Sequence, residues 1–505
     1  MDILSNSLIL GFQQVLHPIN FLYCFGGVVM GTLIGVLPGI GPVATMSILF
    51  PLTLTASPLS SIIMLAGIYY GAMYGGSTTS ILVNIPGEAA SVVTCLDGHQ
   101  MARRGRAGPA LGICALGSFI GGTFSVIILM VLVIPLSKVA LRFGPAEFVG
   151  FISMGLAMTI YLSGRSMLKG LAMCISGLIL GCVGTDIVSG EIRFAYGFSL
   201  LYDGIEMAPM VMGLFGISEV LLNIGRLEQR SIFKTRVKNL LPNLQDWKHS
   251  ALPIARGSIL GFFLGLIPGG GTILASFISY TVEKRVSKRS EEFGRGAIEG
   301  VAGPETANNA AVAGAFVPLF ALGIPSNVVM AILLASFMVH GVAPGPGFIV
   351  NNPALFWGII ASMYIGNAML VILNLPLIGM WVQILRIPYR VLFPLILLFC
   401  VIGAYSINFL AFDVFVMVVF GLLGYVLRKY DYPLAPMVFA FVLGPMFELA
   451  FQQTAIISSH NLFFIVQRPV AFVTCCIGAF LLISGLFSHL WKLRKRIIES
   501  TMVEE

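Results

Sequence analysis

Residues 31–41 read GTLIGVLPGIG, and residues 261–271 read GFFLGLIPGGG. The Gly and Pro positions that they share are all separated by one offset (261 − 31 = 230): Gly31/Gly261, Gly35/Gly265, Pro38/Pro268, Gly39/Gly269 and Gly41/Gly271. The chain therefore contains two copies of one element, each an apolar helix broken at Pro-Gly. Because unwound backbone at membrane depth is tolerated only where it lines a cavity, paired breaks of this kind indicate the binding site of a transporter.

The composition is that of a polytopic membrane protein. Of the 505 residues, 57% are hydrophobic and 10% are charged, and the mean hydropathy is +0.95. Ordinary soluble domains carry about 25% charged residues. Apolar runs of about 18 residues or more recur along the chain, each long enough to cross a bilayer. No Lys or Arg precedes the first of them, so we expect it to stay in the mature protein rather than to be cleaved as a signal peptide.

The net charge of +7 comes from Lys and Arg residues that cluster between apolar runs. This arrangement follows the positive-inside rule and argues for cytoplasmic loops and against a nucleic-acid partner. The eight cysteines show no CxxC spacing, and most lie within apolar runs. We therefore expect neither disulfides nor a metal site beyond sodium.

The basic clusters also predict how the broken segments lie in the membrane. Lys and Arg residues flank residues 256–282 on both sides, and each arm spans roughly 16–18 Å, too short to cross alone. This segment is expected to enter as a hairpin and return to the cytoplasm. Residues 21–58 have no flanking Lys or Arg, so their hairpin is expected to enter from the periplasm. The two copies would then be inverted.

The predicted fold is an all-α polytopic membrane protein of two inverted repeats, each with a re-entrant hairpin and a broken transmembrane helix, and about eleven crossings. The N terminus is expected in the periplasm and the C terminus in the cytoplasm. Lys138 and Arg142 oppose this topology, which places both outside. The predicted parts are a first repeat (residues 1–227, hairpin 21–58, broken helix 60–86), a cytoplasmic linker (228–250), a second repeat (251–491, hairpin 256–282, broken helix 298–325) and a cytoplasmic tail (492–505).

Polar residues gather beside both breaks. They lie in residues 74–88 (YGGSTTSILVNIPGE), 303–309 (GPETANN) and 323–327 (GIPSN). At the hairpin offset, Thr78 and Thr79 correspond to Asn308 and Asn309 (308 − 78 = 230), whereas the Ile-Pro dipeptides differ by 239 (324 − 85 = 239), which predicts an insertion between these features. Free N–H groups at helix N termini suit a carboxylate, and carbonyl and hydroxyl oxygens suit sodium. The alternative is that small residues only let helices pack closely.

These patterns give two sets of candidates. Glu305 is either an intramembrane functional carboxylate or a cap of the following helix N terminus. Glu88 and Asp97 are expected at the cytoplasmic surface. The candidate substrate-binding residues are Gly39, Gly41, Ser77, Thr78, Thr79, Asn84, Gly269, Gly270, Gly271, Asn308 and Asn309. The candidates for ion coupling are Thr78, Glu305, Thr306 and Asn308.

No pattern of catalytic residues is visible in the sequence. Ser77 and Ser80 have no neighbouring His or Lys that would activate a nucleophile, and the chain contains no G-x-x-x-x-G-K-[ST] motif for ATP. The triplet Arg103, Arg104 and Arg106 fits either a positive-inside loop or an attractor for an anion. A membrane enzyme is therefore the weakest of the candidate classes.

Four stretches resemble the large membrane subunit of bacterial tripartite tricarboxylate transporters: residues 31–42 (GTLIGVLPGIGP), 74–90 (YGGSTTSILVNIPGEAA), 96–112 (LDGHQMARRGRAGPALG) and 303–311 (GPETANNAA). The resemblance implies a secondary transporter of the inner membrane, driven by sodium or protons. It also implies two partners, a small membrane subunit and a periplasmic solute-binding protein. Family members import citrate-like tricarboxylates, dicarboxylates, aromatic acids or amino acids. The alternative is a carboxylate carrier or anion channel that needs no binding protein.

Overall fold

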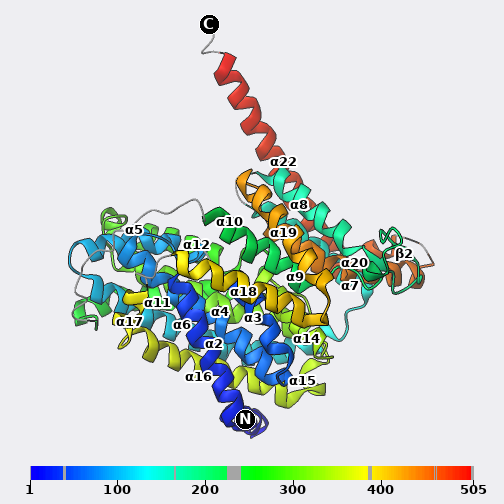
Figure 1. The fold of residues 1–505 in the computed structure, drawn as a ribbon. Helices are drawn as coiled ribbons and strands as arrows, with labels where there is room; N and C mark the ends of the chain where they lie inside the picture. Colours follow the sequence, from blue (N-terminus) through cyan, green and yellow to red (C-terminus); the bar gives the residue numbers. More distant parts are fainter. Residues whose placement is uncertain are drawn as a thin grey trace. The chain divides into compact units, whose positions relative to one another are not determined.

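The computed structural model describes residues 2–37, 41–163, 166–223, 240–384, 389–459, 461 and 463–501. Most of them are helical (Figure 1). The one sheet among them pairs β1 (Gly184–Thr185) with β2 (Ile192–Arg193) in an antiparallel ladder. The expectation of an all-α protein is confirmed.

The chain divides into two compact units, and each draws on both halves of the sequence. The first comprises Met1–Leu141 and Ala208–Tyr425, and the second comprises Arg142–Met207 and Val426–Glu505. The helices of the first unit are α1 (Asp2–Val15), α2 (Pro18–Val36), α3 (Gly41–Leu54), α4 (Pro58–Val83), η1 (Ala89–Ser91), α5 (Val92–Arg103), α6 (Ala107–Ala140), α9 (Met207–Val211), η3 (Met212–Ile217), α10 (Ser218–Asn223), α11 (Leu244–Gly265), α12 (Gly271–Val286), η4 (Ser290–Glu292), α13 (Glu299–Leu322), α14 (Val328–Val339), α15 (Phe348–Asn351), α16 (Pro353–Asn374), α17 (Ile378–Ile384), α18 (Tyr389–Asn408) and most of α19 (Ala411–Lys429).

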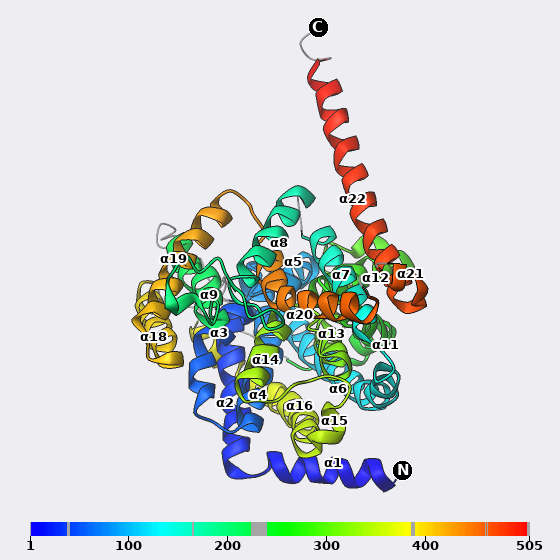
Figure 2. The same ribbon diagram turned by 90° about the vertical axis from the view of Figure 1, so that its right-hand side faces the viewer.

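The second unit is built on two helix pairs, α7 with α22 and α8 with α20. A salt bridge of 3.5 Å between Glu147 and Arg468 lies beside the first pair. In the loop after α8, the Ser189 hydroxyl donates to Asp186 and holds the pKa of that carboxyl at about 2. The last helix, α22, contains 33 residues and is seen in side view in Figure 2. The elements of this unit are α7 (Pro145–Tyr161), α8 (Met167–Gly181), β1, β2, η2 (Ser199–Leu201), α20 (Ala435–Ile457), α21 (Phe463–Gln467) and α22 (Pro469–Thr501).

Among the described residues, six helices are long and apolar enough to cross a membrane. Their apolar segments are Pro18–Val36, Ala107–Ala140, Pro353–Asn374, Ala411–Lys429, Ala435–Ile457 and Pro469–Phe487. A multi-pass membrane protein is therefore confirmed, while the count of eleven crossings and the inversion of the repeats stay predictions. The helix α1 lies across the end of α2 (Figure 2).

The two helices α4 and α13 form the centre of the first unit. They contain 26 and 24 residues, long enough to span a bilayer, yet they carry many Gly, Ser, Thr and Asn residues. Nearly all of their residues are buried. Helices this polar are stable in the membrane only because neighbouring helices surround them and satisfy their polar groups.

Stripes of glycine bring α2 against α4 and α11 against α13. A Cβ on any of these glycines would lie 2.2–2.5 Å from a carbonyl oxygen of the partner helix, so only glycine permits the approach. The contacts pair Gly27, Gly31 and Gly35 with Met64, Ile68 and Ala72, and Gly257, Gly261 and Gly265 with Gly303, Ala307 and Ala311. The glycines repeat at the offset of 230, whereas their partners repeat at 239 (303 − 64 = 239).

The offset of 239 corrects the correspondence drawn from the sequence. Both helices end on a left-handed residue at this offset, Asn84 (φ 59°) and Gly323 (φ 72°). Asn308 and Asn309 therefore correspond to Tyr69 and Tyr70, and the pairing with Thr78 and Thr79 is wrong. The insertion lies before α13, in the loop that carries η4, because α12 and α13 are separated by more residues than α3 and α4.

The helices α11 and α12 form an antiparallel pair around the turn at residues 266–270. The Arg256 guanidinium on α11 binds the Glu283 carboxylate on α12, with Nε 2.8 Å from Oε1. The helix α11 begins earlier than expected, at Leu244, because the Asn243 side chain caps the N–H of Asp246. At 22 residues it is roughly 33 Å long and exceeds the expected arm, but it is not among the described helices that are both long and apolar enough to cross, so the hairpin stays a prediction.

Candidate functional site

The two breaks that follow α4 and α13 have the same local structure. After Asn84 and Gly323, each chain segment passes through Ile-Pro and starts a new helix three residues later. Glu88 caps η1 by accepting the N–H of Ala90 at 2.6 Å, and Asn327 caps α14 by accepting the N–H of Met330 at 2.9 Å. These two caps are again 239 residues apart.

Each cap reaches the long helix of the other copy. The Asn327 amide donates to the Tyr69 hydroxyl on α4 at 3.2 Å, and the Asn308 amide on α13 donates to Glu88 Oε1 at 3.3 Å. Tyr69 and Asn308 occupy equivalent positions on α4 and α13, and Glu88 and Asn327 occupy equivalent positions after the two breaks. Each contact therefore joins the cap of one copy to the same position on the long helix of the other copy. We call these the crossed contacts. They join the two breaks into one site within the first unit.

Glu305 lies beside the crossed contacts in the interior of α13. Its side chain is 1% exposed. Ser77 on α4 donates to Oε2 at 2.6 Å, and Thr94 on α5 donates to Oε1. The alternative of a helix cap is wrong, because both carboxylate oxygens accept hydroxyl groups of other helices, and α13 begins six residues earlier. Ser77 and Glu305 are among the candidates drawn from the sequence, Thr94 is not, and the functional roles of these residues stay predictions.

Asn309 faces a different neighbour from Asn308. Its amide donates to the Ser118 hydroxyl at 2.7 Å and to the Glu305 carbonyl at 3.1 Å. It also lines a small cavity of about 20 Å³ together with Tyr70, Gly122 and Asn367. That volume holds about one water molecule, so in this conformation it is too small for a carboxylate substrate.

The threonines among the candidates make local contacts. The hydroxyls of Thr79 and Thr306 donate to carbonyls of their own helices, those of Gly76 at 3.0 Å and Ala302 at 2.7 Å. Thr306 also fills the space beside two glycines of α6. Thr78 is buried, at 3% exposure. Their hydroxyl oxygens keep lone pairs for a ligand, and their part in binding or coupling stays a prediction.

The glycines at the hairpin tips adopt backbone that other residues avoid. Gly41, Gly269 and Gly271 have φ values of 65°, 90° and 29°, whereas Gly270 has φ of −109°. The N–H of Gly269 donates to the carbonyl of Ser326 at 2.8 Å, so the second tip is bonded to the second break. Gly39, the remaining candidate, lies outside the described residues.

Two acidic residues lie deeper than the sequence indicated. Glu88 is 8% exposed and Asp97 is fully buried, so placing them at the surface is wrong. Asp97 accepts the N–H groups of Gly294, Gly296 and Ala297 at 2.7–2.9 Å and the Tyr280 hydroxyl at 2.9 Å. It thus ties α5 to the loop before α13. The glycine-rich loop, with its free N–H groups, was the available signal for an anionic partner.

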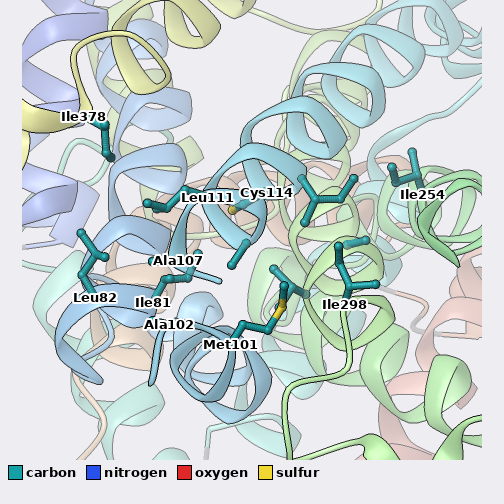
Figure 3. Close-up of a cluster of buried hydrophobic side chains, with 14 residues drawn as sticks. Ile81, Leu82, Met101, Ala102, Ala107, Leu111, Cys114, Ile254, Ile298 and Ile378 are labelled. Carbon is teal, nitrogen blue, oxygen red and sulfur yellow. The ribbon is translucent and has the colours of Figure 1, made fainter. Parts of the chain in front are cut away.

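An apolar cluster packs between the helices that carry these side chains (Figure 3). Ile81 of α4, Met101 of α5, Cys114 of α6, Ile254 of α11 and Ile298 beside α13 all belong to it. It fixes the helices that carry Ser77, Thr94 and Glu305. The Glu305 cluster is therefore positioned by packing of the three helices that supply its groups, α4, α5 and α13.

The charges of the site are unbalanced. Among the described residues, no salt bridge includes Glu88 or Glu305, although both carboxylates are buried. The described part also holds no group of three or more His, Cys, Asp or Glu residues suited to a metal ion. A buried carboxylate without a cation is costly unless it is protonated or a cation binds.

A multi-pass helical protein whose two central helices end in irregular, polar backbone at equivalent positions is typical of secondary transporters. The comparison with protein families is more specific. Residues 21–439 match the tripartite tricarboxylate transporter TctA family, and the chain belongs to that family. It is the family of the large subunit of these tripartite systems.

The relatives cover the chain to different extents. An uncharacterized 52.8 kDa protein in the TAR-I ttuC' 3'region of Agrobacterium vitis is 50% identical over 497 residues, which are 98% of this chain and 99% of that protein. An uncharacterized protein in the TAR-II ttuC' 3'region of the same species is 52% identical over 47% of this chain and 98% of its own length. An uncharacterized Methanocaldococcus jannaschii protein is 22% identical over 54% of this chain and 63% of its own. No solved structure matches significantly.

Proposed function

We propose that this chain is the large transmembrane subunit of a binding-protein-dependent secondary transporter that imports organic anions, tricarboxylates such as citrate or related carboxylates, by symport with sodium or protons. Membership of the TctA family is the observation that carries the proposal. The partners would be a small membrane subunit and a periplasmic solute-binding protein. The chain would lie in the bacterial inner membrane, with its N terminus in the periplasm and its C terminus in the cytoplasm.

The chemistry of the site supports an ion-coupled carrier. The crossed contacts and the Glu305 cluster supply amides, hydroxyls and irregular backbone, which bind small ligands without transforming them. Two buried carboxylates would repel an anionic substrate unless their charge were neutralised. Uptake of a carboxylate at this site therefore requires that a cation or proton binds as well, and this requirement is the physical basis of symport.

The two breaks also suit alternating access. Each places a short new helix against the long helix of the other copy, so moving one break changes the contacts of both. Gly269 adds the hairpin tip to the same set of contacts. The small volume of the cavity beside Asn309 fits a conformation in which the substrate space is collapsed. In this proposal the space opens when the helices of the two copies separate.

The test is reconstitution. The chain and its small membrane partner are reconstituted into proteoliposomes, and the periplasmic binding protein is added outside the vesicles. Uptake of radiolabelled carboxylates is then measured under imposed sodium or proton gradients. We expect uptake only with a gradient and with the binding protein present. Ligand screening of the binding protein by thermal shift identifies which carboxylate to use.

The stand-alone carrier is the second candidate. It predicts equal uptake with and without the binding protein. The membrane enzyme predicts product formation in detergent, where no gradient exists. Failure of every tested carboxylate to enter under either gradient, with all three components folded, would reject the proposed function.

A further inference from the structure

The Glu88 carboxylate is buried and has only uncharged partners. Its Oε2 accepts the N–H of Ala90 at 2.6 Å, its side chain also accepts the N–H of Ser91 in the capping box of η1, and Oε1 has a long contact of 3.3 Å with the Asn308 amide. No Lys, Arg or His pairs with it among the described residues. At 8% exposure it has little access to water. A positive charge beside Oε1 would correct this deficit.

Asn308 has a complementary deficit. Its side chain is fully buried, and its Oδ1 has no hydrogen-bond partner among the described residues. A buried carbonyl oxygen without a partner costs about 1–3 kcal/mol. Oxygen and nitrogen of an amide exchange places when the group turns over. Turned over, Asn308 would point Oδ1 at the Glu88 carboxylate, and only a cation or a proton between the two oxygens would make that arrangement favourable.

The equivalent contact in the other copy shows that neither deficit is needed for the fold. There, Asn327 accepts the N–H of Met330 with Oδ1 and donates to the Tyr69 hydroxyl with Nδ2, so the amide is satisfied. Asn327 caps its helix as Glu88 caps η1. An asparagine at position 88 would therefore serve the fold equally well. The carboxylate at 88 and the unpaired oxygen at 308 call for another explanation.

Two further oxygens lie beside the backbone next to Glu88. A Cβ on the preceding residue, Gly87, would lie 2.2 Å from the carbonyl oxygen of Gly35 and 2.8 Å from the hydroxyl of Thr79. These two oxygens, the Glu88 carboxylate and Asn308 Oδ1 are the hard ligands that sodium takes in transporters with unwound helices. A proton needs one acceptor, whereas a sodium ion needs several, so the gathering of oxygens favours sodium.

We propose that Glu88 and Asn308 are ligands of a sodium ion at the first break, and that this ion is the one coupled to anion uptake. The coupling rests on the proposed function, whereas sodium binding itself does not. With sodium bound, the charge of Glu88 is cancelled and the site accepts a carboxylate. Without sodium, the anion meets an unpaired buried carboxylate and is repelled.

Sodium binding is tested on the purified full-length chain without substrate or partners. The probe is ²²Na⁺ in a scintillation proximity assay, with unlabelled sodium, potassium and protons as competitors. We expect saturable binding to the wild type. Glu88→Gln and Asn308→Ala should each weaken it at least about tenfold, because each removes one oxygen ligand or charge from a desolvated site.

Asn308→Asp separates a sodium ligand from a structural amide. Aspartate keeps the oxygens and loses the N–H that donates to Glu88. If Asn308 is a sodium ligand, this variant binds sodium with unchanged or higher affinity. If its role is only to donate to Glu88, two carboxylates face each other, and the protein is destabilised whether or not sodium is present. Glu292→Gln, on an exposed loop, is the matched control and should bind as the wild type does.

The outcomes are decisive. Unchanged ²²Na⁺ binding by folded Glu88→Gln protein overturns the proposal. Absence of saturable ²²Na⁺ binding to the folded wild type overturns it as well and leaves protonation as the way to neutralise Glu88. Should Glu88→Gln fail to fold, Asn308→Asp and Asn308→Ala decide the question. Sodium binding without carboxylate uptake in the reconstituted system would leave the sodium site intact and reject the proposed function instead.

Discussion

The first break, after α4, and the second break, after α13, have the same backbone conformation but different capping side chains. Both follow a left-handed residue, Asn84 or Gly323, and both start a new helix with a side-chain cap. The cap is a carboxylate at Glu88 and a neutral amide at Asn327. The difference indicates that the duplicated scaffold is retained for its shape, whereas the chemistry of the cap differs and only the first break has a charged one.

The largest expected effect is a loss of uptake at the hairpin tips, where both copies depend on backbone conformation rather than on side-chain chemistry. Gly269→Val and Gly271→Val should abolish uptake, because a β-branched residue is strongly disfavoured at positive φ. Gly41→Val should do the same in the first copy. Gly270→Val should keep uptake, since its φ is −109° and Ile40 holds the corresponding position. Uptake is measured alongside membrane insertion; full transport by Gly271→Val would show that the tip backbone is not essential.

The glycine stripes provide the next test, and here the two copies should respond alike. Gly35→Ala and Gly265→Ala each place a Cβ 2.3 Å from a carbonyl oxygen of the partner helix. Overpacking of this kind costs typically about 1–3 kcal/mol. Both variants should melt earlier in detergent by thermal unfolding. Gly26→Ala is the control, because nothing lies within 4 Å of its Cβ. Destabilisation in one copy alone would contradict equivalent packing.

The crossed contacts should respond unequally. Tyr69→Phe removes a neutral hydrogen bond worth about 0.5–1.5 kcal/mol, and Asn327 keeps its capping bond. Asn308→Ala removes a group beside a buried carboxylate, where the cost is about 1.5–3 kcal/mol. The apparent affinities for substrate and cation in reconstituted uptake should therefore fall more for Asn308→Ala. Equal losses in the two variants would mean that the charge of Glu88 has no special role.

The sequence predicted the class and the breaks, since Gly-Pro interruptions and basic loops are local signals. The structure brings its candidates Ser77, Glu305 and Asn308 close together, and their roles in binding stay predictions. It misjudged the register of α4 against α13: the Ile-Pro spacing revealed an insertion, but the insertion was placed after Asn309, whereas it lies before α13. The true register appears only where Gly31 and Gly261 meet their partner helices.

The burial of Glu88 and Asp97 could not be predicted from nearby basic residues. A charge beside a basic loop is normally at the surface, and only tertiary contacts reveal otherwise. Asp97 is satisfied by backbone N–H groups that lie almost 200 residues later in the chain. Glu88 meets Asn308 across 220 residues. Long-range pairs of this kind follow from how the copies pack together, which no local pattern in one sequence specifies.

The smallest effect on uptake is expected for cysteine substitutions that report, by thiol labelling, from which side of the membrane the second hairpin enters. Lys248 and Arg295 are exposed residues on either side of the second hairpin. Lys248→Cys and Arg295→Cys should leave uptake nearly unchanged, since surface substitutions usually change stability by less than about 0.5 kcal/mol. If the second hairpin enters from the cytoplasm, both cysteines react with a membrane-impermeant thiol reagent only in inside-out vesicles. The length of α11 makes this test informative, because the helix is long enough to cross although it is not apolar enough to count among the candidate spans. Labelling of position 295, but not 248, from the periplasm would show that the segment crosses and that the two copies are not related by inverted hairpins.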